Sequence, residues 1–125
     1  MVVTIITILA SIAIPKISNA IQTSKDGALK GNLGSLRSAV QVYYADNEGN
    51  YPSDLAALTV NGKYISALPP ITELSHPPSS AVVLGTSSDD TGGWLYNNVS
   101  GDANEGGVSI NCVHSDHKGL PWTSY

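Results

Sequence analysis

Side chains that bind metals or transfer protons gather near the C-terminal end of this 125-residue chain. The residues concerned are Cys112, His114, Asp116 and His117. In a strand Cys112 and His114 would share one face, and His117 would reach them across a turn. Structural zinc sites usually contain C-x₂₋₄-C or H-x₃₋₅-H pairs, and this spacing matches neither pattern. We therefore expect surface histidines beside a small buried thiol, and no zinc site.

The acidic side chains of the glycine-rich loops form a second group that could bind a metal. Calcium takes roughly six to eight oxygen ligands, and flexible loops of this kind supply them. The spacing of the acids matches no EF-hand loop, so we treat them only as weak calcium candidates. These candidates are Asp89, Asp90, Asp102 and Glu105. We expect no other metal and no cofactor.

Sequence motifs for catalysis are absent from the chain. It contains no Gly-x-Ser-x-Gly, no phosphate-binding loop, no His-Glu-x-x-His and no haem-attachment C-x-x-C-H. Serine, histidine and aspartate occur without a spacing that indicates a catalytic triad. The single cysteine excludes an intramolecular disulfide. The sequence therefore predicts a non-enzymatic protein without catalytic residues.

Charge is distributed unevenly along the chain. Six Lys and Arg against ten Asp and Glu give a net charge of −4, which argues against nucleic acid as the main partner. Residues 1–45 carry +3, whereas residues 46–125 carry −7. Such a split indicates two parts that meet different surroundings, or that meet each other between neighbouring subunits. A solvated acidic domain beside an incidentally basic helix would give the same pattern.

The first part of the chain, residues 1–15, is expected to be an apolar transmembrane or filament-core helix segment. Met1 to Ile14 contains no charge, and its few hydroxyl groups can bond to carbonyls one turn earlier. The run is apolar on every side, but it is shorter than the roughly 20 residues that span a bilayer. It fits a signal-peptide core, a buried core helix or a membrane span that begins upstream of Met1, and we favour the last.

Residues 16–50 form a second part, in which the pattern becomes amphipathic. Pro15 ends the apolar run and Lys16 is the first charge. Apolar residues then recur at three- and four-residue steps, and Asn47 with Gly49 supplies the stop. The residues expected to pack against the rest of the protein are Leu29, Leu33, Leu36, Val40 and Tyr43. Together the two parts predict one helix of about 45 residues.

Residues 51–125 are expected to form a globular α+β head. The segment from Pro52 to Leu58 is typical of a short helix, with Ser53 as its N-cap. A sheet of three or four antiparallel strands would follow, and it needs a partner such as the amphipathic helix for stability. The β-like runs lie at residues 81–86, 93–97 and 107–113.

Two segments carry a resemblance to a known family. The apolar run that leads through the proline spans Ile8 to Ile17, and the element Tyr-Ala-Asp-x-x-Gly-x-Tyr-Pro spans Tyr44 to Pro52. In this order and spacing they resemble the type IV pilin and type II secretion pseudopilin family, over residues 1–70 in particular. The resemblance implies a type IV pilin-like α+β fold, in which a long N-terminal helix packs against a small antiparallel β-sheet head.

The family's properties become expectations for this chain. Members lose a basic leader before an N-methylated phenylalanine that is followed by Thr-Leu-Ile-Glu, and the chain from Met1 onward contains neither element. The resemblance implies that the subunit waits in the bacterial inner membrane until pilus or secretion machinery assembles it into a helical homo-oligomer. Major pseudopilins of the family also hold calcium in a head loop.

The sequence as a whole predicts a structural subunit, a pilin that polymerises through its N-terminal helix into a type IV pilus on the bacterial surface. The expected filament-core residues are Ile8, Leu9, Ala10, Ser11, Ala13 and Pro15. A major pseudopilin of a periplasmic type II secretion pseudopilus is the first alternative. A secreted ligand-binding module with a cleaved signal peptide is the second.

Overall fold

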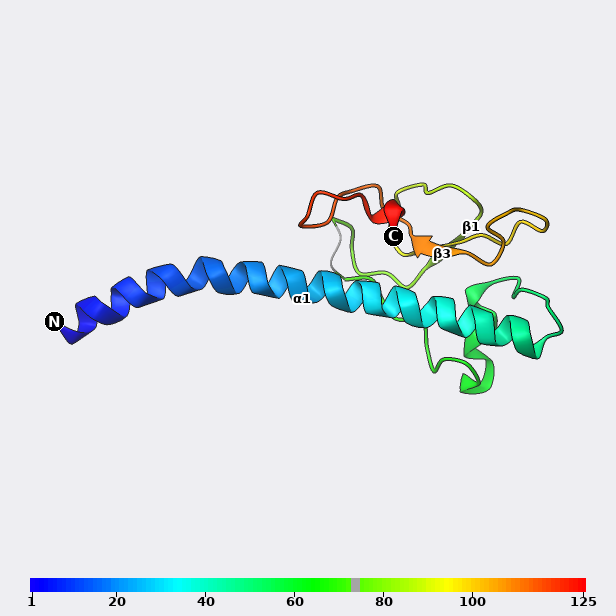
Figure 1. Ribbon diagram of the computed structural model, residues 1–125, viewed down its shortest axis with the longest axis horizontal. Helices are drawn as coiled ribbons and strands as arrows, with labels where there is room; N and C mark the ends of the chain where they lie inside the picture. Colours follow the sequence, from blue (N-terminus) through cyan, green and yellow to red (C-terminus); the bar gives the residue numbers. More distant parts are fainter. Residues whose placement is uncertain (73–74) are drawn as a thin grey trace.

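The computed structural model describes residues 1–72 and 75–125 and shows a long helix with a small head on its C-terminal half (Figure 1). The helix packs against the sheet and the first short helix of the head, which confirms the predicted α+β fold. With η for a 3₁₀-helix, the elements are α1 (Val2–Asp46), η1 (Leu55–Gly62), β1 (Val82–Leu84), β2 (Trp94–Tyr96), β3 (Val108–Ile110) and η2 (Trp122–Ser124).

α1 is one continuous helix of 45 residues with a single buried stripe on its C-terminal half. The stripe consists of Asp26, Leu29, Leu33, Leu36, Ala39 and Val40. Steps of three and four residues place these side chains on one side of the helix, where they meet the head. Pro15 lies inside the helix without ending it, because a proline removes only one backbone hydrogen bond while the turns on either side persist. After Asp46, Gly49 turns the chain with a φ of 85°, a conformation that suits glycine.

The sheet has the order β1-β2-β3 and is mixed, whereas an antiparallel sheet was expected. β2 and β3 pair antiparallel, with Trp94 opposite Ile110, but β1 and β2 pair parallel. The backbone at the start of β2 lies very close to the residue that precedes β1. The N–H of Trp94 donates to Ala81 O at 2.8 Å, and a Cβ on Gly93 would lie 2.4 Å from that same oxygen. Only glycine therefore fits at position 93.

The first element of the head is the 3₁₀-helix η1, which begins later than the predicted helix from Pro52 to Leu58. Leu55 and Leu58 are both fully buried, and a spacing of three residues puts them on one face of a three-residue turn. The cap is Asp54 and not Ser53, because the N–H of Ala56 donates to Asp54 Oδ1 at 3.3 Å.

The core lies between the buried stripe of α1 and the head. Trp94 and Tyr96 of β2 are fully buried there, together with Ile110 of β3. Both aromatic polar groups are satisfied by backbone oxygens: Trp94 Nε1 donates to Pro69 at 2.8 Å and the Tyr96 hydroxyl donates to Pro52 at 2.6 Å. These bonds hold the 52–69 segment against the sheet, so the head is one packed unit on the helix.

Candidate functional site

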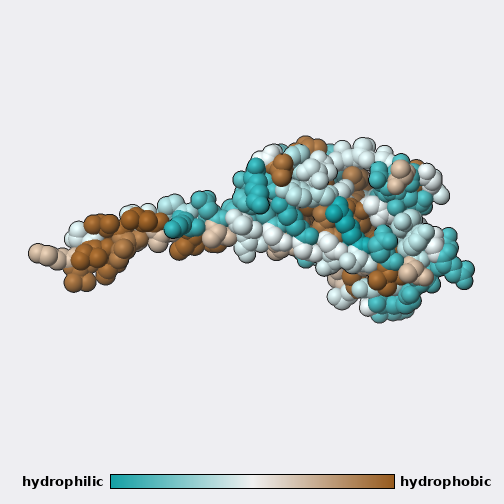
Figure 2. Space-filling model, viewed as in Figure 1, coloured by the Kyte–Doolittle hydropathy of each residue, from teal (hydrophilic) through white to brown (hydrophobic). Residues whose placement is uncertain are grey.

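The N-terminal part of α1 projects beyond the head and is covered by nothing in the subunit (Figures 1 and 2). Ile8 keeps 56% of its surface exposed and Ile12 keeps 63%, although both are large aliphatic residues. Among the described residues, α1 is the one helix long and apolar enough to cross a membrane, and none of its apolar window is buried. Exposed apolar surface of this extent marks an interaction site for lipid or protein.

The projecting segment presents its neighbours with apolar atoms and satisfied hydroxyls. Thr7 Oγ1 donates to Val3 O at 2.7 Å, and Ser11 Oγ donates to Ile8 O at 2.8 Å. Because these hydroxyls are bonded within the helix, they can enter an apolar environment at little cost. All the predicted filament-core residues lie on this exposed helix: Ile8, Leu9, Ala10, Ser11, Ala13 and Pro15.

The residues predicted to hold the head lie where the helix meets it. Leu33, Leu36 and Val40 are at most 2% exposed, and Leu29 is buried beside them. Tyr43 is half-buried, and its ring lies 5.3 Å from that of Tyr64, centre to centre. This contact fixes the segment after η1 against the last turns of α1.

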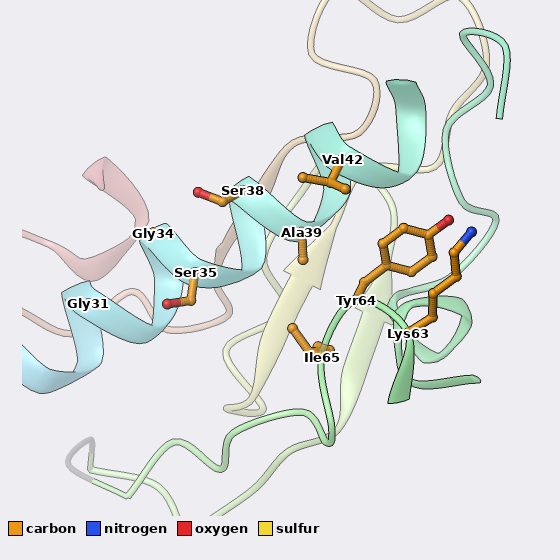
Figure 3. A pocket seen from close by; sticks show the side chains of 9 residues that line it. All are labelled: Gly31, Gly34, Ser35, Ser38, Ala39, Val42, Lys63, Tyr64 and Ile65. Atoms are coloured by element: carbon orange, nitrogen blue, oxygen red, sulfur yellow. The ribbon is translucent and has the colours of Figure 1, made fainter. Parts of the chain in front are cut away.

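A groove of about 670 Å³ runs along α1 beside that segment (Figure 3). Apart from Val42, its helical wall consists of small residues, and a Cβ on Gly31 or Gly34 would meet open space. Lys63 and Tyr64 form the opposite wall, with the Lys63 ammonium 3.3 Å from the carboxylate of Asp46. The exposed face of α1 therefore carries little side-chain bulk next to the head.

Two basic residues of α1 anchor β3 and the end of the chain to the helix. Arg37 Nε donates to Val108 O at 2.9 Å, and its Nη2 donates to Tyr125 O at 2.7 Å. Lys30 Nζ lies 3.0 Å from Asp116 Oδ2. The Tyr125 hydroxyl and Lys30 hold the pKa of the Asp116 carboxyl well below its usual range, against the opposing effect of burial. Two of the basic residues of α1 are thus used within the subunit.

The weak calcium candidates do not form one ligand set. Asp89 and Asp90 precede β2, whereas Asp102 and Glu105 lie between β2 and β3, where each accepts hydrogen bonds from its own loop. Of the four, only Asp90 belongs to a group of metal-ligating atoms within 4.8 Å of one another, as far as the described residues go. Nothing in the structure tests whether these weak candidates bind calcium.

The group around Asp90 unites side chains that are distant in the sequence: His76, Asp90, Cys112 and His114. Asp90 Oδ1 lies 3.2 Å from His76 Nε2 and 3.5 Å from His114 Nδ1. Cys112 Sγ lies 3.4 Å from the same His114 nitrogen. The thiol is buried and the His114 ring is exposed, so the group opens to solvent on one side.

Electrostatics in this group favour a charged carboxylate and a protonated thiol. The N–H of Val113 donates to Asp90 Oδ1 at 2.9 Å, and this bond is the main reason that the pKa of Asp90 is lowered. The charge of His114 acts in the same direction. Burial raises the pKa of the Cys112 thiol.

The other residues of the C-terminal group lie elsewhere. His117 was expected to reach Cys112 across a turn, but its Nδ1 instead hydrogen-bonds the carboxylate of Asp26 on α1. Asp116 faces Lys30. Sequence reasoning missed His76 and Asp26 as members of such groups, because their partners come from other parts of the chain and no local spacing signals them.

Comparison with known proteins gives one informative similarity. The chain is 32% identical to Fimbrial protein EcpC of Eikenella corrodens over 127 residues, which covers 96% of this chain and 81% of that protein. The alignment therefore includes both the projecting helix and the head. No family model matches the chain. No solved structure matches it.

Proposed function

The chain belongs to the fimbrial protein family, and on this premise we propose that it is a structural subunit that polymerises through its N-terminal helix into a type IV pilus filament. The observation that carries the proposal is the exposed apolar segment of α1, residues 2–14, which lies on the part of the helix that projects beyond the packed head. Exposed apolar surface of this kind is stabilised when it is buried against other apolar groups. The same segments of neighbouring subunits would bury it. The family's structural role also supports a non-enzymatic subunit.

Assembly would exchange one apolar environment for another. Before assembly the inner-membrane lipid covers residues 2–14, and pilus machinery then transfers the subunit to the fibre. Helices leaving lipid gain little from the hydrophobic effect, so close packing and dispersion must drive their association. Ala10 and Ala13, one turn apart among larger aliphatic residues, allow a neighbouring helix to approach.

The uneven distribution of charge along the chain contributes less to contacts between subunits than the sequence indicates. Lys30 pairs with Asp116, and Arg37 binds backbone oxygens of its own head. These cations therefore hold each head on its own helix. Any pairing between subunits falls to the remaining charges, and exposed pairs are individually worth under about 1 kcal/mol.

A double substitution on the projecting helix tests the proposal. Ala10→Leu with Ala13→Leu keeps the segment apolar, so insertion into the membrane is retained. The added bulk obstructs close helix packing at about 1–3 kcal/mol per contact, and the cost repeats at every subunit. Surface filaments, sheared from cells and counted by electron microscopy, should fall by about tenfold or more.

The matched control is Ile5→Leu with Ile8→Leu, which has the same spacing and conserves volume. Immunoblots of the membrane fraction must show equal subunit amounts in all strains. Wild-type filament numbers in the Ala10→Leu, Ala13→Leu variant would contradict the proposal. Fibres confined to the periplasm would identify a secretion pseudopilus, and a mature chain that starts after Ala13, seen by mass spectrometry, would identify a secreted module.

A further inference from the structure

We propose that His76, Asp90, Cys112 and His114 are the four ligands of a structural zinc site in the head. The proposal is independent of filament formation, because all four residues belong to the head of one subunit. It replaces the expectation, drawn from local spacing, that the cysteine and histidines bind no zinc.

Three of the six ligand–ligand separations in the group match those around a tetrahedral zinc ion. With bonds of about 2.0–2.3 Å from zinc to nitrogen, oxygen or sulfur, the ligand atoms of a tetrahedron lie about 3.3–3.6 Å apart. Asp90 Oδ1 lies 3.2 Å from His76 Nε2 and 3.5 Å from His114 Nδ1, and Cys112 Sγ lies 3.4 Å from His114 Nδ1. All four ligand atoms lie within 4.8 Å of one another. Small side-chain movements would place them around one ion.

The donor set selects zinc over calcium. One thiolate, two imidazoles and one carboxylate suit a borderline-soft cation, whereas calcium and magnesium require oxygen ligands. The thiolate and the carboxylate together carry two negative charges, which balance Zn²⁺ in a partly buried position. Zinc binding would release the thiol proton of Cys112. Because burial raises the pKa of this thiol, part of the binding free energy would go into removing the proton.

The loop before β2 is held in place for this role by groups outside the ligand set. The N–H of Val113 donates to Asp90 Oδ1 and orients the carboxylate. The Asn111 side chain accepts from Ser88 Oγ at 2.7 Å and from the N–H of Asp89 at 3.1 Å, which fixes the residues before Asp90. Supporting hydrogen bonds of this kind position the ligands of metal sites in proteins.

The position of His76 depends on a glycine. A Cβ on Gly92 would lie 3.0 Å from the Cβ of His76, closer than such atoms normally approach. Gly92 therefore lets the His76 loop approach the start of β2, where the rings of His76 and His114 meet edge to face with centres 5.1 Å apart. Zinc would cross-link three segments that only tertiary packing joins: the His76 loop, the loop before β2 and the chain after β3.

The second group of metal-binding side chains on the described part of the chain lacks these properties. Asp26, Asp116 and His117 offer three ligand atoms, but the Lys30 ammonium already lies 3.0 Å from Asp116 Oδ2. The positive charge of this lysine would repel a metal ion. This group supplies the matched control, because His117 is a surface histidine of the same head.

Cobalt(II) titration of the purified full chain in detergent micelles tests the site. Tetrahedral cobalt bound to a thiolate gives intense visible bands and a near-ultraviolet sulfur-to-cobalt charge-transfer band. We expect these bands to saturate at one cobalt per chain, to disappear when zinc is added, and to accompany a higher melting temperature with zinc. Cys112→Ser should abolish the charge-transfer band, and His114→Gln should abolish tetrahedral binding.

His117→Gln should bind cobalt and zinc as the wild type does. The proposal is overturned if the wild type shows no stoichiometric binding, if His114→Gln binds unchanged, or if His117→Gln loses binding instead. His114 is exposed, so its substitution leaves the fold intact even where the buried Cys112 variant does not. Near-ultraviolet circular dichroism of the metal-free variants checks this, and the readout does not require filaments.

Discussion

At the scale of single residues, Tyr96 shows how one side chain joins separate parts of the head. Its ring is fully buried in β2, and its hydroxyl donates to Pro52 O at 2.6 Å, in the segment that leaves α1. Burial raises the pKa of the phenol to about 12, and the negative charge of Glu105 adds to the shift. The neutral phenol is therefore the form that the folded protein stabilises.

Tyr96→Phe should lower the free energy of unfolding by about 1–3 kcal/mol at neutral pH, because the Pro52 carbonyl loses its donor. The folded pKa is above the unfolded value of about 10. The tyrosine's contribution is therefore complete below pH 10 and is lost as the pH rises toward 12. Urea denaturation should show that the difference in unfolding free energy between wild type and variant becomes smaller over that range. A difference that stays constant up to pH 12 would contradict this prediction. The control is Tyr51→Phe, which removes the hydroxyl of a half-buried ring.

At the residue scale, the sequence indicated that Cys112 and His114 would share one face if they lay in a strand. β3 ends at Ile110, and the two side chains meet instead in the irregular segment that follows it, with Sγ and Nδ1 3.4 Å apart. His76 and Asp90 join them through loop packing that no local pattern encodes. His117 bonds Asp26 of α1 instead. A group of side chains drawn from three separate segments can be found only once the fold is known.

At the scale of elements, α1 is a single helix with two different surroundings. Its C-terminal half buries one stripe against the head, while its N-terminal part has no partner within the subunit. The stripe was predictable because apolar residues recur at helical spacing. The parallel pairing of β1 with β2 was not, because three-residue strands carry too little pattern to fix their direction.

Leu36→Ala should lower the free energy of unfolding of the head by about 2–5 kcal/mol, because the removed atoms leave a cavity between α1 and the sheet. Leu36 is 1% exposed. Val42→Ala, on the exposed side of the same helix, should change stability by about 0.5 kcal/mol or less. Denaturant melts followed by tryptophan fluorescence give both values. Equal effects of the two substitutions would contradict the assigned buried face.

At the scale of the whole molecule, the dominant feature is an apolar rod attached to a polar head (Figure 2). The head satisfies its own polar groups: no buried side-chain nitrogen or oxygen among the described residues lacks a hydrogen-bond partner. The apolar side chains of the projecting helix, by contrast, are not buried by any other described part of the subunit. The proposed function therefore has lipid, and then copies of the same subunit, cover this apolar surface.

A cryo-electron microscopy reconstruction of the surface filament tests this account most directly. We expect residues 2–14 of neighbouring subunits to pack against one another along the filament axis, with Leu36 still buried under its own head and the heads facing outward. A filament in which residues 2–14 are exposed to solvent, or in which subunits join through the edge strands β1 and β3, would contradict it.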